Sequence, residues 1–377
     1  MATKPRVVFI FTSGRRARLA SREPVPSELF YGYVELVAQG WNLDLIEESD
    51  VVPYRRALSY RALARVLPEP LDISLPRLAG FVSRLGTLNQ YDVVFCTNQQ
   101  HGVELSVLKA AGLLRPPLVT LVMGLLPAAP PSSARAALLA RILRRTTVVA
   151  ISRGEEAFLR GQLGGQLDLR YAPFGVDHHF WQPTPIPSNA YVISVGNDRH
   201  RDFELLMRIW RPEWPRLRVV TRLALPPSRG PIEVVAGHYN QVLITDVQMR
   251  EHVQNALFSV IPVRQTAQPS GQSAALQAMA AGVPLIVSDT TGMWDRAVMR
   301  DGETCLAPRC GSDEAMVAAV ERMISSAQLR EQLRRAGREA IEQHLSAEIM
   351  ASELGKVFRS VSAGPALREP VRDAVNA

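Results

Sequence analysis

Short runs of apolar and β-branched residues alternate with helix-length segments along almost the whole chain. The segments between the runs, such as 27–39 and 102–111, carry apolar residues at the spacing of an amphipathic helix. This alternation is the βαβ pattern of parallel sheets with helices on both faces. The runs predicted as strands are residues 7–11, 43–46, 93–96, 119–122, 148–151, 191–195, 217–220, 242–244, 257–261 and 285–287.

One proline-rich stretch, from residue 173 to residue 189, interrupts the alternation with Pro173, Pro183, Pro185 and Pro187. Proline clusters of this kind are typical of linkers. A chain of 377 residues is also long enough for two domains. We therefore expect two α/β sheets joined by a linker, with a cleft between them and ligands at the carboxyl ends of the strands.

The composition argues against several classes of protein. No apolar run reaches the roughly 18 residues of a membrane-spanning helix, and the run at residues 7–12 is too short for the core of a signal peptide. Three cysteines give no disulfide framework, and Cys305 and Cys310 lack the spacing and partners of a zinc site. We expect a reduced, cytoplasmic protein.

The first candidate phosphate-binding segment opens a predicted helix with Ser270, Gly271, Gln272 and Ser273. A helix N-terminus binds phosphate through its free N–H groups and the positive end of its dipole. Serine and glycine also simply cap helices, so composition alone leaves both interpretations open.

The second candidate segment follows the predicted strand 191–195 and contains Gly196, Asn197, Arg199 and Arg201. Arginines in such a loop can hold a diphosphate by charge-assisted hydrogen bonds. The alternative is a polar loop whose arginines are exposed to solvent.

A dinucleotide-binding dehydrogenase is another class of protein with alternating strands and helices. It is disfavoured because no GxGxxG motif follows either of the predicted strands 7–11 and 191–195.

Four segments within residues 148–310 occur in an order and spacing typical of one enzyme family: VVAISRGEEAFL, LRYAPFGVDHHFWQP, GNDRHRDFELL and SGQSAALQAMAAGVPLIVSDTTGMWDRAVMRDGETCLAP. Together they resemble the retaining nucleotide-sugar glycosyltransferases of the GT-B fold, glycosyltransferase family 4. The closing LREQLRRAGREAIEQHLS resembles the C-terminal helices of that family. The N-terminal region matches in outline only, with a glycine-containing loop at Gly14.

The resemblance implies an α/β fold with two Rossmann-like, doubly wound parallel-sheet domains facing each other across a cleft. Residues 1–180 would form an acceptor-binding domain and residues 181–345 a domain that binds the nucleotide-sugar. Residues 346–377 would include a helix that returns to the N-terminal domain. The reaction would move a sugar from a UDP- or GDP-sugar to an acceptor hydroxyl, in the synthesis of glycans, glycolipids or glycosylated metabolites.

The resemblance also implies roles for single residues. Arg199 and Arg201 fall where the family places a basic pair on the diphosphate, and Gln277 falls where a glutamate accepts hydrogen bonds from the ribose. No cofactor or metal is expected, because no cluster of carboxylates is apparent and arginine can replace a divalent ion. Val247 would lie near the base, and the sugar and distal phosphate would meet Ser270, Gly271, Gln272 and Ser273. The remaining donor-binding candidates are Gly14, Gly196 and Asn197.

Three positions depart from the family pattern. Gln268 and Gln277 stand near or at the places of two glutamates, which leaves a catalyst and a non-catalytic GT-B subunit as open alternatives. Met123 precedes Gly124 where the family often has a histidine. His101, in the predicted loop TNQQHG, is then a candidate for contact with the sugar, and a solvated loop histidine is the alternative.

The N-terminal half is basic, with 21 Lys and Arg against 15 Asp and Glu over residues 1–180. Arg15, Arg16, Arg18 and Arg22 follow the first predicted strand, and Arg55, Arg56, Arg61 and Arg65 recur further on. We expect Arg15, Arg16 and Gly124 to contact an anionic or lipid-linked acceptor, with peripheral membrane contact and no nucleic acid. Arginine that serves only solubility is the alternative.

Overall fold

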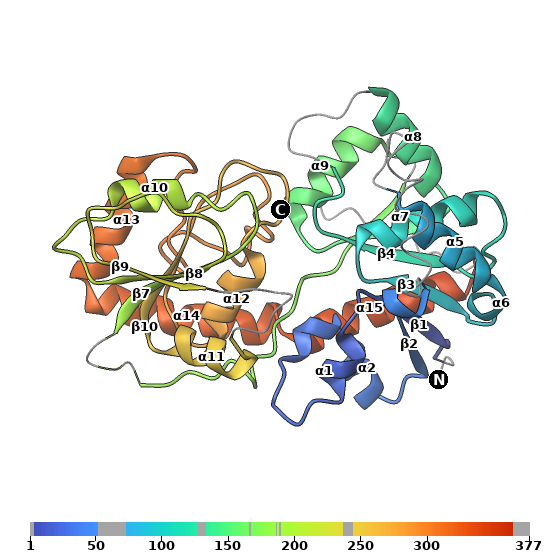
Figure 1. Ribbon diagram of the computed structural model, residues 1–377, viewed down its shortest axis with the longest axis horizontal. Helices are drawn as coiled ribbons and strands as arrows, with labels where there is room; N and C mark the ends of the chain where they lie inside the picture. The colour runs from blue at the N-terminus through green and yellow to red at the C-terminus, as the bar shows by residue number, and fades with distance from the viewer. Residues whose placement is uncertain are drawn as a thin grey trace.

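The computed structural model describes residues 4–51, 73–126, 133–165, 167–185, 187, 190–236 and 244–364. It contains two α/β units side by side, each with a parallel β-sheet between helices (Figure 1). No described helix is long and apolar enough to cross a membrane.

The N-terminal sheet has six parallel strands in the order β2-β1-β3-β4-β5-β6. Its strands β1, β3, β4 and β5 are buried along their whole length, because helices cover both faces. The strands are β1 (Val7–Phe11), β2 (Leu43–Glu47), β3 (Val93–Cys96), β4 (Leu118–Val122), β5 (Thr146–Ala150) and β6 (Asp168–Tyr171). The helices are α1 (Arg15–Leu19), η1 (Ser27–Phe30), α2 (Tyr33–Ala38), α3 (Glu48–Val51), α5 (Leu75–Ser83), α6 (Leu85–Leu88), α7 (Gln99–Ala110), α8 (Ser133–Leu143) and α9 (Arg153–Leu163).

The C-terminal sheet has five parallel strands in the order β11-β10-β7-β8-β9. The strands are β7 (Tyr191–Val195), β8 (Leu217–Thr221), β9 (Ile232–Ala236), β10 (Ala256–Ile261) and β11 (Leu285–Val287). The helices are α10 (Phe203–Ile209), α11 (Asp246–Gln254), α12 (Gln272–Ala280), α13 (Asp313–Ser325) and α14 (Ala327–His344).

Strand order locates the ligand-binding edge of each sheet. In the C-terminal sheet the chain runs from β7 outward to β8 and β9 and then returns to add β10 on the other side of β7. The N-terminal sheet reverses in the same way between β1 and β3. Ligands of open α/β sheets bind at the carboxyl ends of the two strands where the order reverses. In this fold, ligands are therefore expected at the loops after β7 and β10 and at the loops after β1 and β3.

Two expectations about secondary structure were wrong or incomplete, and a third lies largely outside the described residues. The predicted helix 27–39 is broken into η1 and α2, because Tyr31 and Gly32 have positive φ angles of 49° and 79°. The strands β6 and β9 were missed, since both carry charged residues at a sheet edge. Of the predicted strand 242–244, residues 242 and 243 lie outside the described residues.

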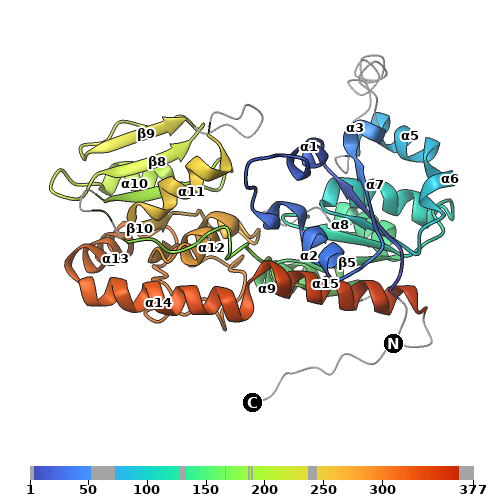
Figure 2. The same ribbon diagram turned by 90° about the horizontal axis from the view of Figure 1, so that it is seen from below.

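The chain passes between the units twice, and the two crossings run side by side. The Val176 N–H donates to the Leu345 carbonyl over 2.9 Å, and the Ala347 N–H donates to the Val176 carbonyl over 3.0 Å. The second crossing leads into α15 (Ala347–Ser362), which continues from α14 beneath the N-terminal unit (Figure 2). The ring of Phe358 on α15 packs against Phe95 of β3, with centroids 5.2 Å apart.

Candidate active site

The loops after β7 and β10 are joined by several hydrogen bonds at the carboxyl edge of the C-terminal sheet. The Arg264 N–H donates to the His200 carbonyl over 2.8 Å, and the Asp202 N–H donates to the Pro262 carbonyl over 3.1 Å. The Ser270 hydroxyl also donates to the carboxylate of Asp198. Two segments that the sequence predicted separately as phosphate-binding loops are thus brought together in one place.

The turn before α12 presents backbone N–H groups at this edge. Gly271 caps the helix with a positive φ of 87°, where a side chain would be strained, and no side chain caps the helix N-terminus. The first turn of α12 contains no acidic residue. A helix N-terminus without a side-chain cap leaves N–H groups available to an anionic ligand.

The guanidinium of Arg201 lies against this turn and is buried. A Cβ on Gly271 would come within 2.7 Å of Arg201 Nη1, and one on Gly196 within 2.1 Å of Arg201 Nε. Glycine at both positions therefore makes room for the arginine. Arg201 Nε lies 2.9 Å from Asp198 Oδ2, whereas Arg199 in the same loop is exposed.

The other donor-binding candidates lie in different environments. Asn197 Oδ1 accepts a 2.7 Å hydrogen bond from the Arg222 N–H and so fixes the loop to the end of β8. Ser273 is exposed, whereas the buried Gln272 donates from Nε2 to the Ile151 carbonyl of the N-terminal unit over 3.0 Å. Val247 lies in the first turn of α11, and Gly14 is the cap residue of α1, with no atom within 4 Å of a Cβ built on it.

Gln268 reaches from the C-terminal unit to the end of β4. Its Nε2 donates to the Leu126 carbonyl over 3.3 Å. Its amide group also lies against Gly124, which has a φ of 105°. The N–H groups of Gly124 and Leu125 donate to one carboxylate oxygen of Glu155 over 2.6 and 3.0 Å. Burial raises the pKa of Glu155 to about 7.

Gln277 has a carboxylate partner that the sequence did not reveal. Its Nε2 donates to Oε1 of Glu28 in η1 over 3.1 Å. The same carboxylate accepts from Trp181 Nε1 over 2.7 Å and from the Asp177 N–H over 2.9 Å. Burial raises the pKa of Glu28 to about 7, although these donors act against the shift.

His101 is not in the solvated loop that was one of the two alternatives for it. It lies in the first turn of α7 rather than in a loop, and its side chain is buried. The Asn98 amide donates to Nδ1 over 2.9 Å, which leaves the proton on Nε2, 3.7 Å from Glu48 Oε2. The ring edge packs on Phe81. The prediction of a solvated loop histidine is therefore wrong, because helix capping and aromatic packing enclose the ring.

The arginines after β1 are partly neutralised. Arg16 forms an ion pair with Asp50 at 2.7 Å, and Arg18 forms one with Asp246 of the C-terminal unit at 3.1 Å. Arg22 is exposed, and Nε of Arg15 has no hydrogen bond to the described residues. The candidates Arg55, Arg56, Arg61 and Arg65 lie outside the described residues.

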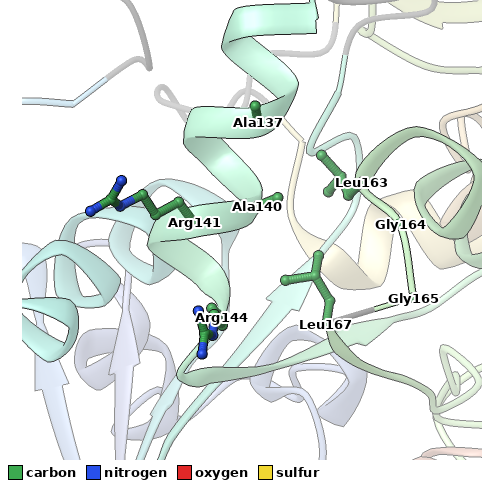
Figure 3. A pocket seen from close by; sticks show the side chains of 8 residues that line it. All are labelled: Ala137, Ala140, Arg141, Arg144, Leu163, Gly164, Gly165 and Leu167. Atoms are coloured by element: carbon green, nitrogen blue, oxygen red, sulfur yellow. The ribbon is translucent and has the colours of Figure 1, made fainter.

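A cavity of about 410 Å³ lies elsewhere, between α8 and the segment that joins α9 to β6 (Figure 3). Leu163 and Leu167 form part of its wall, and Arg141 of α8 and Arg144, just after that helix, also line it. All of its lining residues belong to the N-terminal unit, so it is separate from the phosphate-binding loops.

Sequence reasoning missed the acidic partners, namely Glu28, Glu155, Asp198 and Asp246. Glu28 accepts from Gln277, Glu155 accepts from Gly124, and Asp246 forms an ion pair with Arg18. In each of these three pairs the two residues are more than 30 positions apart in the sequence. Only Asp198 gave a local signal, because it stands beside Arg199 within the predicted loop.

Comparison with known proteins identifies the fold. The sucrose-phosphate synthase of Thermosynechococcus elongatus superposes with a TM-score of 0.70 at 16% identity, over 95% of this chain and 99% of that one. HepE of Anabaena, solved with UDP-glucose, gives 0.67 at 13%, over 94% and 100%. A glycosyltransferase of Rickettsia africae gives 0.64 at 10%, over 95% and 99%. The protein therefore has the GT-B fold, which confirms the predicted fold class.

The family follows from the sequence of the C-terminal unit. Residues 192–326 match the family model of the glycosyl transferases group 1. No curated protein matches the chain significantly. The C-terminal unit is thus a group 1 glycosyltransferase domain, and the resemblance to this class of glycosyltransferase is confirmed.

The contact between Gln277 and Glu28 predicts that restoring the family's glutamate is harmful here. Gln277→Glu would place two carboxylates about 3 Å apart in a buried site. Two carboxylates in one buried site repel when both are ionised, and the pKa of one rises strongly, so the folded state either bears the repulsion or holds a proton. Either cost grows as the pH rises, because the unfolded chain is ionised at both groups. We expect a loss of about 1–3 kcal/mol in stability at pH 8, visible as a lower Tm, and a smaller loss at pH 5.5.

The matched control is the double variant Glu28→Gln with Gln277→Glu, which exchanges the two groups. We expect it to recover most of the lost stability at pH 8, because one carboxylate again faces one amide. A Gln277→Glu protein as stable as the wild type at pH 8 would show that the contact does not matter.

Proposed function

We propose that the protein is a retaining glycosyltransferase that moves a sugar from a UDP- or GDP-sugar to an acceptor hydroxyl. One observation carries the proposal. The Arg201 loop and the N-terminus of α12 meet at the point where the strand order of the C-terminal sheet reverses. In this place a diphosphate would find both N–H donors and guanidinium groups. HepE, which shares the fold, was solved with UDP-glucose and with UDP.

A bound diphosphate would replace the carboxylate of Asp198 as the partner of Arg201. Arg201 is paired with Asp198 in this structure, and the Ser270 hydroxyl donates to the same carboxylate. A bound diphosphate would compete with Asp198 for both groups, and Arg199 would close over the phosphates from the exposed side of the loop. Gln277 would accept a hydrogen bond from the ribose through Oε1, while its Nε2 remains on Glu28.

Catalysis would consist mainly of charge stabilisation on the leaving group. Arginines and helix N–H groups stabilise the charge that develops on a departing diphosphate without any metal ion. The leaving phosphate would take the proton of the acceptor hydroxyl on the same face of the sugar, so that the anomeric configuration is retained. His101 would act from the N-terminal unit by holding Asn98, which follows β3, and Glu48, which follows β2.

The acceptor would enter over the N-terminal unit, near Arg15, Arg22 and the turn at Gly124. Two of the four arginines after β1 are paired with acids, so the remaining positive charge would come from Arg15, Arg22 and Arg55–Arg65. We propose an anionic or lipid-linked acceptor, reached from the membrane surface. The products would be glycans, glycolipids or glycosylated metabolites made in the cytoplasm.

A second candidate function is a non-catalytic GT-B subunit. Gln268 and Gln277, which stand where the family has glutamates, both bind the N-terminal unit in this structure, at Leu126 and Glu28. Both therefore contribute to the contact between the units. Donor turnover separates the two functions, because a non-catalytic subunit would bind a nucleotide at most and would release no nucleoside diphosphate from a donor.

The paired charges predict opposite effects of neighbouring substitutions on affinity for a nucleoside diphosphate. Arg201→Ala should weaken binding by about 1.5–3 kcal/mol, since a hydrogen bond to a charged group is lost. Asp198→Asn should strengthen binding by about 0.5–1 kcal/mol, because it removes the competing charge from a partly exposed site. Isothermal titration with UDP and GDP measures both.

Arg211→Ala is the control for the titration, since Arg211 is paired with Glu321 on α13. Its affinity should equal that of the wild type. Because Arg201 is buried, the folding of Arg201→Ala is checked by its melting curve. Equal affinity in all variants would place the diphosphate elsewhere.

The stereochemistry and the metal requirement are tested in one reaction. After metal removal with EDTA, we expect continued turnover and a product with the anomeric configuration of the donor, because arginines and N–H groups supply the positive charge. Proton NMR of the anomeric signal reports both results. An inverted product, or activity that returns only with Mn²⁺, would refute these parts of the proposal.

Acceptor recognition is tested by flotation with vesicles that contain anionic lipid. At low salt the protein should float with the vesicles, and charge reversal of Arg55, Arg56, Arg61 and Arg65 to Glu should abolish flotation. Reversal of Arg208 and Arg211 in the C-terminal unit is the matched control and should leave it intact. Wild-type protein that ignores the vesicles would favour a neutral, soluble acceptor.

A further inference from the structure

The two segments that cross between the units are paired at one point, and from this point both run in the same direction. Val176 of the first crossing and Ser346 of the second form a parallel bridge. The approach is close, since a Cβ on Gly175 would lie 2.0 Å from the Ser346 carbonyl oxygen. The residues two positions after the bridge, His178 and Glu348, therefore face each other.

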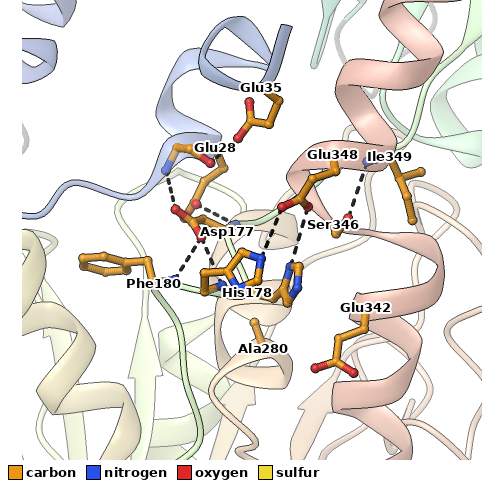
Figure 4. Close-up of polar contacts among 12 residues, drawn as sticks. Glu28, Glu35, Asp177, His178, Phe180, Ala280, Glu342, Ser346, Glu348 and Ile349 are labelled. Carbon is orange, nitrogen blue, oxygen red and sulfur yellow. Dashed lines mark hydrogen bonds and ion pairs between the residues drawn. The ribbon is translucent and has the colours of Figure 1, made fainter. Parts of the chain in front are cut away.

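Three side chains with metal-binding groups converge there. Nδ1 of His178 lies 3.7 Å from one carboxylate oxygen of Glu348, and Nε2 of His179 lies 3.6 Å from the other (Figure 4). One ligand atom from each of the three residues lies within 4.8 Å of the other two. Ligand atoms about 2.1 Å from a Zn²⁺ ion stand about 3–3.5 Å apart, so small side-chain movements would complete the site.

The first histidine has a geometry suited to a metal ligand. Only 16% of its side chain is exposed, and Nδ1 has no hydrogen bond among the described residues. Nδ1 is thus not committed to another described residue, and it lies beside the carboxylate of Glu348, as a metal ligand in this site would.

The surrounding backbone fixes the ligands in place. The carboxylate of Asp177 accepts hydrogen bonds from the N–H groups of His179 and Phe180 over 3.1 and 2.9 Å, which holds the turn that carries both histidines. The Ser346 hydroxyl caps α15 at the Ile349 N–H, and this positions Glu348 in the first turn. The site is thus built on a fixed turn and a capped helix rather than on a free loop.

We propose that His178, His179 and Glu348 bind a late first-row divalent cation, of which Zn²⁺ is the reference, and that the ion ties together the two crossings between the units. Imidazole and carboxylate are ligands that Zn²⁺ accepts, whereas Mg²⁺ and Ca²⁺ prefer oxygen ligands alone. Three protein ligands leave a coordination position open to water. The site is separate from the phosphate-binding loops and does not depend on the proposed transferase activity.

The test is calorimetric titration of full-length, tag-free protein, stripped of metal by EDTA and desalted, with ZnCl₂ and separately with MgCl₂. We expect one equivalent of Zn²⁺ to bind and Mg²⁺ not to bind. His179→Ala and Glu348→Gln should each weaken the affinity for Zn²⁺ at least about tenfold, since they remove direct ligands. Both side chains are well exposed, at 73% and 46%, so neither variant is expected to unfold.

The matched controls are His344→Ala and Glu342→Gln, which remove an exposed histidine and an exposed acid from neighbouring α14. Both should bind Zn²⁺ like the wild type. Zn²⁺ should also raise the Tm of the wild type and of the controls but not of the double variant His179→Ala with Glu348→Gln. If that double variant binds Zn²⁺ as tightly as the wild type, or the wild type binds no Zn²⁺, the proposal is wrong.

Discussion

A single buried carboxylate joins the parts of this protein that must face each other. Glu28 of the N-terminal unit accepts hydrogen bonds from Trp181 and Asp177 of the linker and from Gln277 of α12 in the C-terminal unit. A buried carboxylate is costly unless it is fully hydrogen-bonded, so the three donors and the acid depend on one another. The apolar core continues around them through Phe174, Phe180 and Trp181. This junction therefore contributes to the relative placement of the two sheets, together with the contacts of Gln268 and Gln272.

The same junction favours glutamine at position 277, where the resemblance to family 4 predicts a glutamate. A second carboxylate beside Glu28 would be repelled. The amide satisfies Glu28 with its N–H group and keeps its carbonyl oxygen for another donor. The departure from the family pattern thus has a structural cause, and it does not by itself indicate the loss of catalysis.

The sequence predicted those features that depend on local pattern. Buried strands such as β1 and β10 are short apolar runs, and the turn at Gly271 was found because small and polar residues, Ser270 to Ser273, open a predicted helix. Edge strands β6 and β9 were missed because their exposure dilutes the apolar pattern. The partners of the site residues were also missed, since Gln277 and Glu28 are 249 positions apart and only the folded chain brings them together.

We propose above all that the Arg201 loop and the N-terminus of α12 hold the diphosphate of a nucleotide-sugar. The most direct measurement is a crystal structure of the protein with a bound nucleoside diphosphate. We expect the phosphates to lie at the N–H groups after Gly271, with the guanidinium of Arg201 turned from Asp198 toward them. Phosphates bound at the N-terminal sheet instead, with the ion pair between Arg201 and Asp198 intact, would contradict the account.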